Sequence, residues 1–141
     1  MNVERILSYL LVYCGVIHLL NVPALAAAPR LLEWREPTER AAKGAAWLRV
    51  QSVALGIVIV GLGAVVIVHA REIAYGGTFS ASITAVLSLF WAYRTLVHVR
   101  LYARSGDEAG YRIHWLLGTL FAVVSASYFA VSWHAYVAHP M

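Results

Sequence analysis

Charged residues are scarce in this chain, and long stretches contain none. Only 13% of its 141 residues are Asp, Glu, Lys or Arg, whereas an ordinary soluble domain carries about a quarter. The composition therefore excludes a typical soluble domain. The longest stretches without any charged residue are residues 6–29, 50–70, 73–93 and 113–141.

The small numbers of cysteine and acidic residues exclude several kinds of site. Cys14 is the single cysteine, so neither an intrachain disulfide nor a cluster of thiolate metal ligands can form. The seven acids all lie in predicted loops or near termini, which leaves no buried acid for general acid–base chemistry. An HExxH motif, paired carboxylates, a Walker loop and a Ser/His/Asp arrangement are all missing. The sequence names no reaction, and whether the protein is an enzyme stays open.

Apolar residues dominate the chain. They make up 61% of the chain, the mean hydropathy is +0.70, and each uncharged stretch reaches the roughly 20 residues that span a bilayer as a helix. We predict one all-α domain over residues 1–141, an integral membrane up-down four-helix bundle. Its four transmembrane helices are expected at roughly residues 5–28, 39–70, 78–104 and 111–138.

The connections follow from glycine and proline. Pro23 and Pro29 are expected to break the first helix near its end. Gly76-Gly77 predicts a tight turn that pairs helix 39–70 with helix 78–104. The first stretch is similar to a secretory signal peptide, but Glu4 offsets Arg5 in its basic region. We therefore expect the segment to be retained as the first helix.

The distribution of cations predicts orientation. Eight lysines and arginines flank one side of the predicted spans, against Arg5 and Arg71 on the other. Cytoplasmic loops carry the excess of cations, so we predict a multi-pass protein of the cytoplasmic (inner) membrane with both termini outside. Cations that flank apolar runs are typical of contacts with lipid headgroups, and nucleic acid is not expected as a partner.

Polar residues within the spans predict a binding site in the cytoplasmic half of the bundle. An arginine inside a lipid-length helix is costly and usually faces protein or water, or extends to a headgroup. Arg94 is therefore the central candidate, and both it and His18 are candidate catalytic residues. Arg94 could instead simply reach the headgroups, and His18 and Asn21 could serve only as hydrogen-bonding contacts between helices. The predicted ligand-binding residues are His18, Asn21, Gln51, Arg94, His98 and His114.

Six histidines raise the question of haem. His69 and His134 match in predicted depth at the outer face, whereas His18 lies deeper than His98 and His114. Interfacial histidines are common without any ligand, so this pattern does not favour haem. We expect no cofactor and no metal.

A family resemblance comes from the first half of the chain. It rests on Arg49 and on two stretches, Gly15-Val-Ile-His-Leu-Leu-Asn-Val-Pro-Ala-Leu and Leu55-Gly-Ile-Val-Ile-Val-Gly-Leu-Gly. This layout resembles small bacterial DoxX-like four-helix membrane proteins. The resemblance implies a lipophilic or quinone-type ligand and an accessory role beside an oxidoreductase, but it assigns no catalytic residue. Tyr93-Arg94 and His98, in the second half, depart from it.

Three functional classes follow. The first is an accessory or binding subunit whose polar pocket holds a lipid-like or quinone-like molecule. The second is a small membrane enzyme, of the isomerase or cyclase type, that acts on a hydrophobic substrate. The third is a structural subunit of a larger complex. Membrane lipids are the expected partners in each, together with further copies of the chain or other membrane subunits, since polar stripes on helices 78–104 and 111–138 suit close helix contact.

Overall fold

The computed structural model describes residues 2–31, 39–102 and 108–138, with side chains described over 2–22, 51, 53–100 and 115–138. This part of the chain is helical except at Asn2, His69 and Gly76-Gly77, and it contains no strand. Four helices are long, and one is a short connector. They are α1 (Val3–Leu31), α2 (Glu39–Val68), α3 (Ala70–Tyr75), α4 (Thr78–Tyr102) and α5 (Glu108–Ala138).

Within the described residues, three helical segments are long and apolar enough to cross a membrane. They are Val3–Val22, Thr78–Arg100 and Trp115–Ala138, and a shorter apolar helix covers Val53–Val68. Large apolar side chains are exposed along all four long helices. In water such exposed apolar surfaces would favour aggregation, whereas in a bilayer they would contact the lipid chains. The membrane character predicted from the sequence is confirmed at this level.

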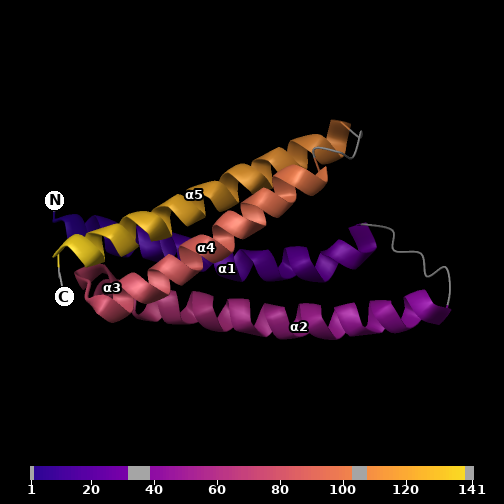
Figure 1. The fold of residues 1–141 in the computed structure, drawn as a ribbon, viewed down its shortest axis with the longest axis horizontal. Coiled ribbons are helices and arrows are strands. Elements are labelled where there is room, and N and C mark those ends of the chain that lie inside the picture. Colours follow the sequence, from indigo (N-terminus) through magenta and orange to yellow (C-terminus); the bar gives the residue numbers. More distant parts are fainter. Residues whose placement is uncertain (1, 32–38, 103–107, 139–141) are drawn as a thin grey trace.

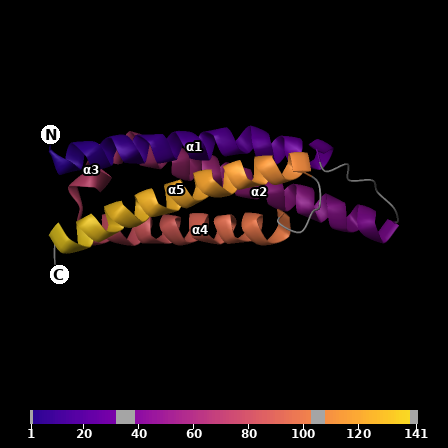
Figure 2. The ribbon, with the colours of Figure 1, turned by 90° about the horizontal axis from the view of Figure 1, so that it is seen from above.

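The long helices form two hairpins (Figure 1). α1 packs on α2, and α4 packs on α5. α3 and both chain termini lie at the same end of the molecule (Figures 1 and 2). In the view of Figure 1 the hairpins lie together at this end and spread apart toward the other. α1 and α4 run in the same direction, because each starts at the end where the hairpins meet.

Close approach of α1 and α2 depends on two glycines. A Cβ added at Gly63 would lie 2.7 Å from the Cβ of His18, and one added at Gly15 would lie 2.9 Å from the carbonyl oxygen of Gly63. Small residues allow membrane helices to approach to backbone contact. Gly56 and Gly61 face open space instead. Of Gly56, Gly61 and Gly63, it is therefore Gly63 that fixes the crossing with α1, and it sets His18 against α2.

The α4–α5 hairpin is joined by hydroxyl groups. Ser88 Oγ donates to the carbonyl oxygen of Ser125 at 3.0 Å, and Ser125 Oγ donates back to the carbonyl oxygen of Ser88 at 2.9 Å. Ser132 Oγ donates to the carbonyl oxygen of Ala81 at 2.9 Å. Thr84 bonds within its own helix, to Ser80. The polar stripes predicted on helices 78–104 and 111–138 thus contact each other through these serines, within one chain.

Two connections differ from the sequence prediction. α1 continues through Pro23 and Pro29 to Leu31, so neither proline ends it. Proline is tolerated in membrane helices when other groups satisfy the freed backbone. Gly76 and Gly77 do form the predicted turn, with φ of 95° and 105°, but the short helix α3 precedes it. α3 buries Ala70, Ile73 and Ala74 and packs mainly on α1.

This arrangement also corrects one predicted pairing. Helices 39–70 and 78–104 were expected to pack as an antiparallel pair across the glycine turn. α2 and α4 instead make at most a weak contact. The six residues of α3 separate the end of α2 from the start of α4, and this spacing leaves α4 to pack on α5.

Candidate functional site

His18 lies at the centre of the contact between the two hairpins, with no exposed surface. Its Nε2 accepts a hydrogen bond from the indole Nε1–H of Trp91 at 3.1 Å, and its Nδ1 lies 2.9 Å from the carbonyl oxygen of Cys14. An indole nitrogen can only donate and a carbonyl can only accept. These partners select the neutral imidazole with its proton on Nδ1.

Aromatic rings surround this imidazole. Trp91 stands edge-on to His18 with ring centres 4.8 Å apart, and Tyr128 does so at 5.8 Å. The hydroxyl oxygen of Tyr128 lies 3.4 Å from His18 Nδ1, where it can share the Nδ1 proton. Phe121 packs on Trp91 at 4.9 Å. We call His18, Trp91, Phe121 and Tyr128 the aromatic cluster.

The aromatic cluster bridges helices whose backbones stay apart. α1 and α4 make at most a weak backbone contact, yet the long side chain of Trp91 reaches across to His18. Trp91 and Tyr128 are both fully buried. Neither of them was predicted from the sequence to be a site residue. The signal was available, because buried Trp and Tyr usually find a partner for their polar atom, and His18 lies at matching depth.

Arg94 lies on α4, three residues after Trp91, and is partly exposed. Its guanidinium carbon is 5.0 Å from the ring centre of Phe121 and 5.8 Å from that of Trp91. Arginine stacked on aromatic faces gains cation–π attraction. Its side chain thus extends along the rings of α4 and α5, at the edge of the aromatic cluster.

Asn21 occupies the matching place on α1, three residues after His18. It is 7% exposed, and its Nδ2 is a buried donor without a hydrogen-bond partner. Positions three apart lie on the same helix face, one turn further on. Because α1 and α4 run in the same direction, Asn21 and Arg94 both lie about 4.5 Å beyond the His18–Trp91 hydrogen bond, toward the end where the hairpins spread.

His98 follows one turn after Arg94. Its ring packs edge-on to Phe121, with ring centres 5.1 Å apart, and the residue is partly buried. Phe121 therefore contacts both Arg94 and His98. We call Asn21, Arg94 and His98 the polar layer, with Phe121 as its wall on α5.

Of the two remaining predicted residues, one stands apart from this layer and the other has no described side chain. Gln51 is exposed. The approach of Gly63 to Gly15 and His18 sets the antiparallel register of α1 and α2, and this register places Ile59, buried at 1% exposure, level with Asn21. Gln51 lies eight residues away along α2, about 12 Å, so the structure does not bring it to the group. His114 belongs to α5, but its side chain lies outside those described.

Of the two histidines considered for haem, His69 has a carboxylate partner within its own part of the chain. His69 Nδ1 lies 2.6 Å from a carboxylate oxygen of Glu72, within one turn. In the part of the chain with described residues, no group of three or more His, Cys, Asp or Glu side chains is placed to hold a metal ion.

Comparison of the chain with protein-family models, with curated proteins and with solved structures finds no match. The resemblance to DoxX-like proteins stays a prediction. So do self-association and the catalytic candidacy of His18 and Arg94. The geometry does limit one of these ideas, because His18 would have to give up its bond from Trp91 before Nε2 could accept a proton from a substrate.

Proposed function

We propose that this protein is a multi-pass membrane protein that holds a lipophilic molecule with a polar, oxygen-bearing head at the polar layer. One observation carries the proposal. A buried amide donor on Asn21 has no protein partner, and it lies level with an arginine stacked on two aromatic rings. A buried donor without a partner costs about 1 to 3 kcal/mol, a cost that a ligand oxygen would remove.

The surroundings favour a flat or elongated apolar molecule. Phe121 and Trp91 supply aromatic faces. The guanidinium offers a planar fork of donors that suits a carboxylate, a phosphate or the carbonyl oxygens of a quinone. Lipid- and quinone-like molecules share this combination of an apolar body and an acceptor head.

We place four spans in the cytoplasmic membrane, with both termini outside. α2 supplies the fourth span through the apolar segment Val53–Val68 together with its flanking turns. The support is the cation bias, since Arg5 and Arg71 lie at the end that carries α3, and the other flanking cations follow or precede the opposite helix ends. The polar layer then opens toward the cytoplasmic leaflet.

Orientation is tested with single cysteines in a Cys14→Ala background. Glu36→Cys and Thr78→Cys report on opposite sides. Thr78 is a better site than Gly77, whose φ of 105° disfavours any other residue. A membrane-impermeant maleimide should label Thr78→Cys in intact cells and Glu36→Cys only after lysis. The reverse pattern contradicts the orientation.

Ligand binding is tested with Arg94→Lys, and Arg100→Lys on the same helix serves as the matched control. Arg100 is exposed. Lysine keeps the charge but loses the fork, so Arg94→Lys should lose the copurifying small molecule, identified by mass spectrometry of solvent extracts, while remaining folded. Asn21→Leu should lose it as well. If extracts of Arg94→Lys and Arg100→Lys carry the same molecules in the same amounts, the ligand does not depend on Arg94.

A further inference from the structure

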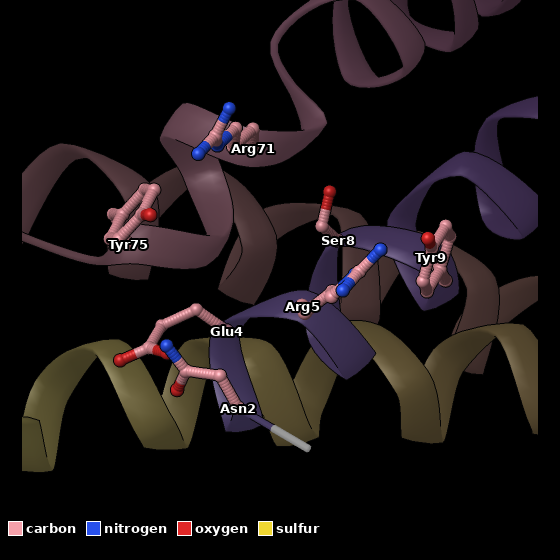
Figure 3. Close-up of a pocket in the computed structure, with 7 residues that line it drawn as sticks. All are labelled: Asn2, Glu4, Arg5, Ser8, Tyr9, Arg71 and Tyr75. Atoms are coloured by element: carbon pink, nitrogen blue, oxygen red, sulfur yellow. The ribbon is translucent and has the colours of Figure 1, made fainter.

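A polar cavity lies at the end of the molecule that carries both chain termini, between the start of α1 and α3 (Figure 3). Its volume is about 480 Å³, and Glu4 is about 25 Å along α1 from Asn21. The function proposed above does not involve this cavity. It is lined by Asn2, Glu4, Arg5, Ser8, Tyr9, Arg71 and Tyr75.

Two arginines supply positive charge to this cavity. Within the described residues, neither Arg5 nor Arg71 forms an ion pair with a carboxylate. Glu72, the nearest acid in sequence to Arg71, is engaged by His69 at 2.6 Å. The Arg71 guanidinium lies 5.9 Å from the ring centre of Tyr75. The cavity thus holds two cations whose charge no described acid offsets through contact.

Glu4 supplies the opposite charge. Its Oε2 atom is buried and has no hydrogen-bond partner. Figure 3 shows Glu4 beside Asn2, with the Arg5 side chain directed away from it toward Tyr9. An ionised carboxylate accepts hydrogen bonds only, so Oε2 needs a donor from outside the protein. The two signs of charge are therefore displayed separately around one cavity.

The location narrows the class of ligand. The cavity lies where the membrane-length segment Val3–Val22 begins, which is the level of lipid headgroups. Tyr9 and Tyr75 are both exposed there, as aromatic residues of membrane interfaces are. A headgroup with a phosphate and a primary ammonium matches both signs, because phosphate pairs with arginine and an ammonium carries N–H donors. A choline group has no N–H and cannot satisfy Glu4 Oε2.

We propose that this cavity binds the headgroup of an ethanolamine phospholipid, with the phosphate at Arg5 and Arg71 and the ammonium at Glu4. The headgroup is then recognised through two separate contacts. The arginines set affinity for any phospholipid, and Glu4 sets the preference for ethanolamine over glycerol or choline.

The test is native mass spectrometry of the detergent-purified full chain, titrated with phosphatidylethanolamine, phosphatidylglycerol or phosphatidylcholine of the same acyl chains. The wild type should bind the ethanolamine lipid most tightly. Arg5→Gln/Arg71→Gln should weaken binding of all three lipids, by roughly tenfold for the ethanolamine lipid. Glu4→Gln should bind the ethanolamine and glycerol lipids equally. Arg100→Gln removes an exposed arginine elsewhere and should match the wild type.

Further arms separate the possible failures. Arg71→Lys keeps the charge but loses the planar fork, so it should bind the ethanolamine lipid more tightly than Arg71→Gln does. Equal binding by these two variants, with normal thermal unfolding, would contradict a contact between Arg71 and the phosphate. Competition with soluble phosphoethanolamine and with inorganic phosphate tests the source. If either displaces the lipid at equal concentration, the occupant is a soluble phosphate compound and the lipid proposal is wrong. Equal binding of all three lipids by the wild type overturns the role of Glu4, and equal binding by the double variant and Arg100→Gln overturns the site.

Discussion

Gly63→Ala should destabilise the crossing of α1 and α2, although alanine is the better helix former. The added Cβ would lie 2.7 Å from His18 Cβ and 3.1 Å from the carbonyl oxygen of Gly15. Neither atom is the end of a flexible side chain, so α1 must move as a body. That movement would also shift His18 away from the Trp91 indole, whose hydrogen bond is 3.1 Å long.

Gly61→Ala is the matched control, since a Cβ there meets nothing within 4 Å. Any gain in helix propensity, up to about 1 kcal/mol, is common to both variants and cancels in the comparison. Overpacking costs about 1 to 3 kcal/mol, so Gly63→Ala should be less stable than Gly61→Ala by that amount. The measurement is reversible unfolding in mixed micelles, followed by tryptophan fluorescence. Equal stability of the two variants would refute the close approach of α1 and α2.

Three further predictions concern the interior. Trp91→Phe removes the hydrogen-bond donor to His18 and should lower the free energy of unfolding by about 1 to 2 kcal/mol. In a double-mutant cycle with His18→Leu, the two losses of stability should not add. If they do add, the hydrogen bond contributes nothing to stability. Ser88→Ala should lower the free energy of unfolding by about 0.6 kcal/mol. Ser82→Ala is the control, because the Ser82 hydroxyl bonds only within α4. Equal effects of the two substitutions would contradict the hydrogen bonds between Ser88 and Ser125. Cys14 has no exposed surface, so a thiol reagent should modify it only in unfolded protein, and rapid labelling of the folded protein would show that the contact of the two hairpins is open.

The membrane class of the fold could be predicted from the sequence because it depends on composition and run length. Uncharged stretches of membrane length show directly in the residues, and so does the Gly76-Gly77 turn. Helix pairing could not be read the same way. It depends on which glycine faces a neighbour, and Gly56, Gly61 and Gly63 look alike in sequence although Gly63 alone of the three meets α1.

The candidate site was predicted in part for a similar reason. His18, Asn21 and Arg94 were singled out because polar groups are costly within spans, and the structure brings them to adjacent turns of α1 and α4. Gln51 was included on depth alone, and depth says nothing about the face of a helix. Phe121 and Tyr128 were not among the predicted site residues, since an aromatic residue in an apolar helix looks like ordinary core until its neighbours are known.

The two-hairpin arrangement has a consequence for how the chain assembles. Each hairpin makes most of its backbone contacts within itself, and the polypeptide passes from one to the other only through α3 and the two glycines. A chain cut between Gly76 and Gly77 would leave two fragments, one with α1, α2 and α3 and the other with α4 and α5. Their association would depend on the packing of α5 against α1 and α3 and on the hydrogen bond from Trp91 to His18, so the contact between the fragments is chemically specific although it is small.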